Sequence, residues 1–192
     1  INPNPGLTVV EIMESIYNKE IKGLYVMGEN PAMSDPNANH AREALARLDM
    51  LIVQDIFLTE TAYLADIVLP ASAFPEKTGT FTNTDRRVQL AKKAINPPGD
   101  AKQDLWIIQE LAKRMGLDWN YSGPDEVYDE LSGCMESMKN ITWERLVNEG
   151  AVTYPCDDSS KPGNEVIFGE GFPTDNKKAR IVPAKIVSPD ET

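Results

Sequence analysis

The sequence predicts an α/β fold in which a parallel sheet is flanked by helices and followed by an irregular C-terminal extension. Short apolar runs at residues 21–27, 50–53 and 67–69 are continuous rather than alternating, and helical patterns separate them. Continuous apolar strands are typical of a sheet covered on both faces, and the intervening helices supply the crossovers that parallel pairing requires. We therefore expect a Rossmann-like arrangement in the first part of the chain.

Amphipathic segments supply the helices. Thr8 and Glu11 form a capping-box pattern, and apolar residues then recur at helical spacing up to Tyr17. Another apolar stripe runs from Asp104 and is ended by Gly116, which suits a helix C-terminus. The same periodicity predicts helices at residues 35–48, 59–65, 104–115, 124–131 and 142–147.

The composition divides the chain into two parts. Residues 1–150 carry the α/β pattern, whereas residues 151–192 are expected to form a linker or wrapping segment. Pro, Gly, Asp and Ser dominate the start of this second part, and only residues 180–182 and 185–187 resemble strands. The chain also opens in Asn-Pro-Asn-Pro-Gly, which is typical of a connector, so we expect it to be a piece of a longer polypeptide.

Charge and hydropathy argue against two classes of partner. There are 19 Lys and Arg against 30 Asp and Glu, which gives a net charge of −11. Such a balance disfavours a nucleic acid or an anionic membrane surface. No apolar run approaches the roughly 18 residues of a membrane span, and no export signal is visible at the N-terminus. We expect a cytoplasmic location without membrane contact or nucleic-acid binding.

The inventory of reactive side chains is small. Cys134, Cys156 and the single histidine, His40, are far apart in the sequence and show no metal-ligand spacing. A zinc, haem or iron–sulfur site cannot be assembled from them, and no nucleophile stands beside a base. We therefore predict neither catalytic residues nor metal ligands in this chain.

Polar residues follow each of the three predicted strands, at residues 28–31, 54–56 and 70–72. Ligands of open parallel sheets lie beyond the carboxyl ends of the strands, where such loops converge. None of these loops carries a glycine-rich phosphate motif. They are either ligand loops or ordinary turns and helix caps, and Asp104 is likewise either a binding carboxylate or a cap at the start of its helix.

A succession of five segments resembles the large (alpha) subunit of molybdenum- or tungsten-dependent formate dehydrogenases, within the dimethyl sulfoxide reductase superfamily. The segments, in order, are Val26–Ala32, Ile52–Ala62, Ala65–Pro70, Glu76–Gln89 and Asp104–Trp106. The likeness extends from about Gly6 to Pro155 and more loosely through Lys178–Pro183. It implies that this chain is the third domain, an α/β domain that binds one molybdopterin guanine dinucleotide, of a four-domain subunit. The Cys or selenocysteine metal ligand and the iron–sulfur cysteines lie elsewhere in such enzymes.

The resemblance also implies functions for particular residues. The loop matching Gly28, Glu29 and Asn30 and continuing to Ser34 lies along the guanine dinucleotide, and the positions of Gln54 and Asp55 contact its nucleoside portion. Asp104 matches a carboxylate at the nucleotide site. A carboxylate accepts hydrogen bonds from both N1–H and the exocyclic amine of guanine, so we assign guanine selection to Asp104, with Asp55 as the alternative.

The resemblance implies that the whole enzyme oxidises formate to carbon dioxide at a molybdenum or tungsten centre and passes two electrons to iron–sulfur clusters. Its partners are the other domains of the same subunit and the electron-transfer subunits, and this piece alone is expected to be inactive. Three alternatives stay open. The chain could come from another molybdopterin oxidoreductase such as nitrate reductase, from the non-catalytic large iron–sulfur subunit of complex I, or from an unrelated nucleotide-binding or interaction domain.

Overall fold

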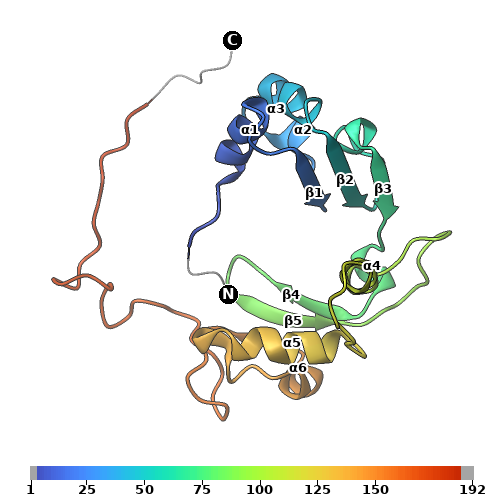
Figure 1. The fold of residues 1–192 in the computed structure, drawn as a ribbon. Coiled ribbons are helices and arrows are strands. Elements are labelled where there is room, and N and C mark those ends of the chain that lie inside the picture. Colours follow the sequence, from blue (N-terminus) through green and yellow to red (C-terminus); the bar gives the residue numbers. More distant parts are fainter. Residues whose placement is uncertain (1–3, 187–192) are drawn as a thin grey trace. The chain divides into compact units, whose positions relative to one another are not determined.

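The computed structural model describes residues 4–186, which divide into two compact units. The first comprises residues 4–73 and Pro97–Ile107, and the second comprises Phe74–Asn96 and residues 108–186. Figure 1 gives the order of the helices and strands along the chain. The division into a domain 1–150 and a segment 151–192 stays a prediction.

The first unit contains a parallel three-stranded sheet in the order β1-β2-β3. Its strands are β1 (Gly23–Met27), β2 (Met50–Asp55) and β3 (Ile67–Pro70), so all three predicted strands are confirmed. Val26 pairs with Val53, and Val53 pairs with Val68. With this register the carboxyl ends of the three strands lie at the same edge of the sheet.

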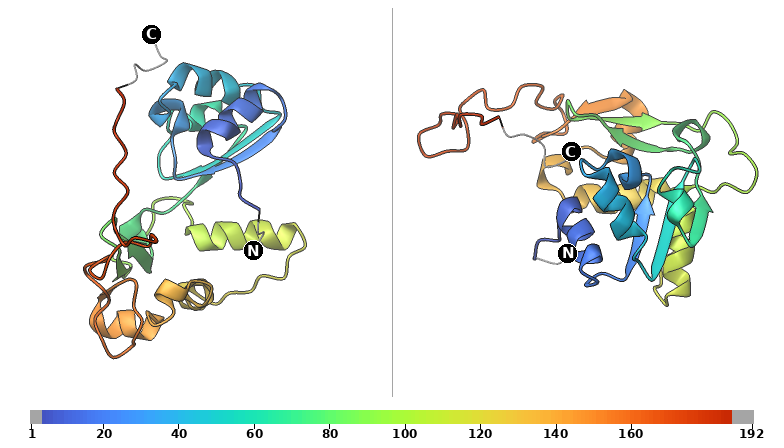
Figure 2. Two further views of the ribbon diagram at one scale, coloured as in Figure 1. Left: turned by 90° about the vertical axis from the view of Figure 1, so that its left-hand side faces the viewer. Right: turned by 90° about the horizontal axis from the view of Figure 1, so that it is seen from above.

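Helices α1 (Val9–Tyr17), α2 (Pro31–Ser34) and α3 (Ala38–Leu45) lie together beside this sheet, as the right-hand view of Figure 2 shows. Thr8 and Glu11 form the predicted capping box at the start of α1. The α1 and α3 side chains facing the sheet make one core with it, which confirms the predicted α/β architecture. Its fully buried large side chains include Ile16, Leu45, Leu51 and Val53.

Two predicted helices of this unit are shorter than expected. The helix predicted at 35–48 begins only at Ala38, because Asp35 is extended with ψ 136°, as the residue before a proline usually is. Asn37 then caps α3 by accepting a hydrogen bond from the His40 backbone N–H at 3.1 Å. The helical stretch predicted at 59–65 is a single 3₁₀ turn, η1 (Ala62–Leu64).

The second unit is built on an antiparallel sheet that the sequence analysis did not anticipate. Its order is β4-β5-β6, with β4 (Gly79–Thr82), β5 (Arg87–Ala91) and β6 (Ala151–Thr153). These strands have three to five residues, and polar side chains interrupt them, so they lack a clear apolar pattern. Helix α4 (Asp104–Arg114) starts in the first unit and continues in the second.

Helices α5 (Pro124–Gly133) and α6 (Trp143–Glu149) pack with this sheet around a second core, and both confirm predicted helices. Short 3₁₀ turns occur at η2 (Phe74–Glu76) and η3 (Glu136–Met138). The core is made by residues far apart in the sequence, namely Val88, Tyr128, Met138, Ile141, Leu146, Val152 and Cys156.

Residues 154–186 contain no helix or strand. The strand predicted at 180–182 is therefore wrong, and so is the described part of the one at 185–187, whose last residue lies outside the described range. Two arginines hold the start of this segment. Arg86 donates hydrogen bonds to the carbonyls of Tyr154, Asn164 and Glu165, and Arg145 donates to the carbonyl of Lys161.

Candidate functional site

The site begins at the carboxyl ends of the three parallel strands. Met27 pairs with Gln54 and Asp55 pairs with Pro70, so the loops that follow β1, β2 and β3 start side by side. The structure thus brings the predicted residues into one unit, although it gives them different surroundings. The predicted set is Gly28, Glu29, Asn30, Ser34, Gln54, Asp55 and Asp104.

Asp104 reaches this edge because the chain returns to it after a long excursion. Ala71, directly after β3, forms an isolated parallel bridge with Lys102. The Ser72 N–H donates to the Lys102 carbonyl at 2.9 Å, and the Lys102 N–H donates to the Pro70 carbonyl at 3.1 Å. Helix α4 starts two residues later, and its first residue is Asp104. The segment before α4 is therefore anchored to the end of β3.

Gln54 and Asp104 lie in direct contact across 50 positions of sequence. The side-chain amide Nε2 of Gln54 donates to Oδ1 of Asp104 at 2.7 Å. Gln54 has no exposed surface, whereas Asp104 is half-buried. The central strand of the sheet thus holds a carboxylate through a buried amide.

Tyr25 completes this group and was missed by the sequence analysis. Its hydroxyl donates to Oε1 of Gln54. Burial raises the pKa of Tyr25, and the negative charge of Asp104 raises it further. Tyr25 lies two residues before the end of β1, on the sheet face that also bears Gln54, because Met27 is the register partner of Gln54. Strand register is the signal that could have found it.

Both backbone and side-chain hydrogen bonds hold the loop after β1. Gly28 has φ +64°, in the left-handed region that favours glycine, and its N–H donates to the Gln54 carbonyl at 2.9 Å. Ser34 Oγ donates to the Asn30 carbonyl at 3.1 Å, and the Glu29 side chain is exposed.

Asn30 and Asp55 use their side chains within the loops. Asn30 contacts Thr61 and donates to Glu60 Oε2 at 2.7 Å, a hydrogen bond that lowers the pKa of Glu60. Asp55 Oδ1 accepts from the backbone N–H groups of Ile56 and Phe57, at 2.6 and 3.3 Å. Both side chains therefore hold the loops that follow the strands.

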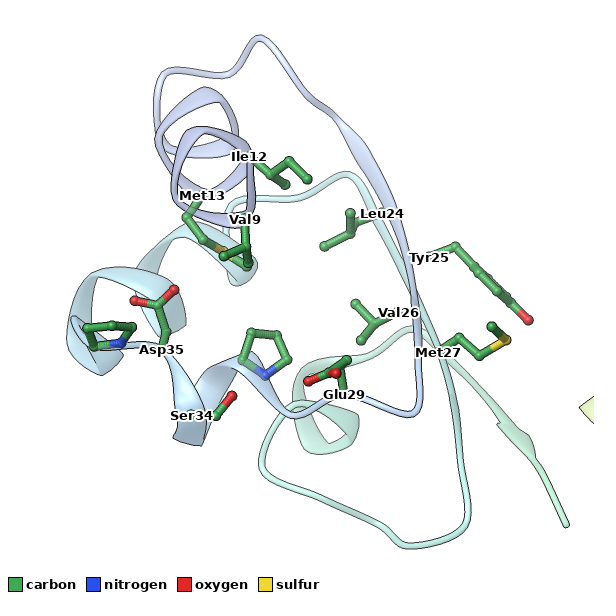
Figure 3. Close-up of a pocket in the computed structure, with 12 residues that line it drawn as sticks. Val9, Ile12, Met13, Leu24, Tyr25, Val26, Met27, Glu29, Ser34 and Asp35 are labelled. Atoms are coloured by element: carbon green, nitrogen blue, oxygen red, sulfur yellow. The ribbon is translucent and has the colours of Figure 1, made fainter. Parts of the chain in front are cut away.

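A groove of about 510 Å³ lies beside β1, on the face covered by α1 and α2. In Figure 3, Leu24 and Val26 point into it, whereas Tyr25 and Met27 point to the other side of the strand. Glu29 and Ser34 line the groove, but Gln54, Asp55 and Asp104 do not. The structure therefore separates the predicted residues into a polar group around Gln54 and a loop that borders an apolar groove.

Among residues 4–186, no three His, Cys, Asp or Glu side chains are grouped so that they could hold a metal ion. Within the same range, none of the helices is long and apolar enough to cross a membrane.

Comparison with known proteins places this chain in a family. Residues 1–114, more than half of the chain, match the family described as molybdopterin oxidoreductase. The chain belongs to the molybdopterin oxidoreductase family. Among solved structures, acetylene hydratase from Pelobacter acetylenicus superposes with a TM-score of 0.60 at 24% identity, covering 76% of this chain and 20% of that one, and so shares the fold.

Several curated relatives are formate dehydrogenases by name. The chain is 46% identical to F420-dependent formate dehydrogenase subunit alpha of Methanocaldococcus jannaschii, with 96% of this chain and 28% of the relative covered. It is 40% identical to F420-dependent formate dehydrogenase 1 subunit alpha of Methanococcus maripaludis, with 100% and 28% covered. It is 43% identical to a putative formate dehydrogenase of Staphylococcus haemolyticus, with 95% and 18% covered.

These matches confirm the resemblance to formate dehydrogenase large subunits. The chain spans less than a third of the length of these relatives. The three alternatives, namely nitrate reductase, the complex I subunit and an unrelated nucleotide-binding or interaction domain, find no support in the comparisons.

Proposed function

We propose that this chain holds the guanosine end of a molybdopterin guanine dinucleotide in an enzyme that oxidises formate to carbon dioxide. The observation that carries the proposal is the contact of 2.7 Å between Gln54 and Asp104 at the carboxyl ends of the parallel strands. Ligands of open parallel sheets bind at this place. The family match supports a molybdopterin cofactor, and the names of the relatives support formate as the substrate.

The donor and acceptor chemistry of the site suits guanine. A carboxylate accepts hydrogen bonds at both oxygens, and guanine presents two donors side by side, N1–H and the exocyclic amine. Adenine presents an acceptor at N1 instead, so it cannot form the same pair. Asp104 is half-buried and anchored, which makes it the first candidate for guanine selection. Asp55 is the second, although its Oδ1 already caps the loop after β2.

The loop of Gly28, Glu29 and Asn30 and the helix α2 that follows it, up to Ser34, are proposed to lie along the dinucleotide. Gly28 has no side chain, so a ligand can approach its backbone closely. Glu29 in the loop and Ser34 at the end of α2 are both exposed and present a carboxylate and a hydroxyl. Asn30 contributes by holding the loop, since its side chain contacts Thr61 and Glu60.

The cofactor, carrying molybdenum or tungsten, supplies the two-electron chemistry when it is bound. This chain's residues bind and orient its nucleotide end. The proposed partners are the remaining domains of the large subunit, which contain the iron–sulfur cysteines, and separate electron-transfer subunits. A cytoplasmic location is part of the same proposal.

Titration of the 192-residue chain with GMP and AMP, followed by NMR, tests the proposal. We expect GMP to bind in the millimolar range, about 4 kcal/mol, and at least about tenfold more tightly than AMP. Asp104→Asn should abolish this preference, because an amide cannot accept both guanine donors at once. Asp100→Asn, an exposed carboxylate in the same segment, serves as the matched control and should retain it. Equal affinities, or no GMP binding up to about 10 mM, contradict the proposal.

A further inference from the structure

We infer that Gln54 and Tyr25 are positioning residues, which set the Asp104 carboxylate for guanine through a directed chain of hydrogen bonds, and that the buried Gln54 does not itself touch the nucleotide. The inference rests on the proposed function, because it explains how that site achieves its selectivity. The juxtaposition that carries it is Tyr25 on β1, Gln54 on β2 and Asp104 at the start of α4.

The direction of the chain follows from the chemistry of its members. An ionised carboxylate only accepts hydrogen bonds, so the Gln54 group facing Asp104 is the amide NH₂. The Gln54 carbonyl oxygen therefore faces Tyr25 and accepts from its hydroxyl. The orientation of the amide is thus determined at both ends.

Burial separates Gln54 from the binding residue Asp104. Gln54 has no exposed surface, and both of its polar atoms are engaged, so a nucleotide at the surface cannot reach it. Asp104 is half-buried and Tyr25 is 38% exposed, so both meet solvent, but only the Asp104 carboxylate can accept both guanine donors. Gln54 therefore differs from Asp55, the next residue of β2, which remains a candidate for direct contact with the nucleotide.

Preorganisation is the physical benefit of this arrangement. A buried amide that lacks a hydrogen-bond partner destabilises the fold by its desolvation free energy. Gln54 therefore favours the Asp104 rotamer that accepts its hydrogen bond. The carboxylate is then held before the nucleotide arrives, and less conformational freedom is lost on binding. Because Gln54 lies on the central strand, the holder is on a rigid element of the fold.

The first experiment measures the ratio of GMP to AMP affinity in two variants of the 192-residue chain. Tyr25→Phe removes only the hydroxyl, and Gln54→Met removes both hydrogen bonds while keeping a similar volume. We expect the ratio to fall about 3-fold in the first and about tenfold in the second, in keeping with the loss of one or two hydrogen bonds. Tyr63→Phe changes a tyrosine that is 73% exposed in the same unit and should leave the ratio unchanged.

The second experiment needs no nucleotide, so it tests the positioning of Asp104 independently of the proposed guanine binding. NMR titration of tyrosine hydroxyls in chain labelled at the tyrosine ring carbon reports the pKa of Tyr25. Asp104→Asn removes a negative charge near the hydroxyl and should lower the pKa of Tyr25. The other tyrosines of the chain are the internal control, and the spectra also show whether each variant is folded.

The outcomes are distinguishable. If wild type prefers GMP and Asp104→Asn abolishes the preference, but Tyr25→Phe and Gln54→Met keep it, the inference is overturned while the proposed function stands. An unchanged Tyr25 titration in Asp104→Asn overturns the inference as well. If wild type shows no GMP preference, the proposed function fails, and the inference fails with it, whatever the tyrosine titration shows.

Discussion

Asn30 and Thr61, 31 positions apart, lock the loop after β1 to the turn before β3. Asn30 Oδ1 accepts hydrogen bonds from both the backbone N–H and the hydroxyl of Thr61, at 3.1 and 2.8 Å. Thr61 Oγ1 in turn accepts from the Ala32 N–H at 3.0 Å. Thr61 has no exposed surface, so these bonds replace all the water that its hydroxyl would otherwise contact. The loop that borders the candidate site is thereby tied to the sheet.

Thr61→Val should destabilise the chain by about 1–3 kcal/mol, because the substitution leaves the buried Ala32 N–H without its acceptor. Urea unfolding followed by circular dichroism measures the change. The same substitution at Thr82, an exposed strand residue, is the control and should change stability by less than about 0.5 kcal/mol. Equal effects at the two positions would show that the Asn30–Thr61 contact contributes nothing.

Gly28 allows a prediction about backbone strain. Its φ of +64° is unfavourable for a side chain, although a Cβ added there would meet no atom within 4 Å. Gly28→Ala should therefore cost about 1–2 kcal/mol through the backbone alone, and Gly28→Asn should cost less, because Asn tolerates this region better. Gly79→Ala, where φ is not positive and the space is also open, is the matched control. Unfolding free energies of the three variants should follow this order, and a fully stable Gly28→Ala would refute the argument.

The two cysteines should differ in reactivity. Cys134 is exposed, whereas Cys156 is buried, with the Arg145 Nη1 at 3.1 Å from its Sγ. Arg145 also donates to the carbonyls of Asn140 and Lys161, at 3.1 and 2.6 Å, so it holds the segment around Cys156 in place. A thiol reagent should modify Cys134 rapidly. It should modify Cys156 at least about tenfold more slowly, since access to this thiol requires local opening of the structure.

Arg145→Lys should accelerate the slow phase, because a lysine cannot reproduce the planar set of donors. Arg114→Lys is the control, since Arg114 is exposed and bonds to Glu110 within its own helix. The Cys134→Ser variant assigns the rapid phase. A slow phase with the same rate in Arg145→Lys and in wild type would show that Arg145 does not hold the segment around Cys156 in place.

The cap of α1 predicts a dependence on pH. Hydrogen bonds from the Thr8 backbone N–H and then from its hydroxyl lower the pKa of Glu11 from its ordinary value of 4.5. A lowered pKa means that Glu11 stabilises the folded state above about pH 4.5, and that this contribution is lost as the pH falls through the folded-state pKa. Thr8→Ala should raise the pKa of Glu11 partway toward 4.5, as NMR titration of the side-chain carboxyl can measure. Unfolding of Glu11→Gln should lack this part of the acid dependence.

Local signals in the sequence were sufficient for the first unit. The three apolar runs gave the parallel strands, and the Thr8–Glu11 pattern gave the start of α1. Pro36 explains why the helix expected at 35–48 begins only at Ala38, since the residue before a proline is extended. The antiparallel sheet was not predicted because its short strands are stabilised by partners distant in sequence, such as β6, which pairs with β5.

The sequence by itself determined the three parallel strands, the capping box of α1 and the family resemblance, because these depend on residues within a few positions of one another or on motifs read in order. Only the tertiary structure decided how the candidate residues divide their functions. Strand register sets Tyr25 beside Gln54, and the bridge between Ala71 and Lys102 brings Asp104 to the same edge. Burial then distinguishes a residue that can meet a ligand from one that can only hold it, and burial depends on contacts between residues up to 50 positions apart.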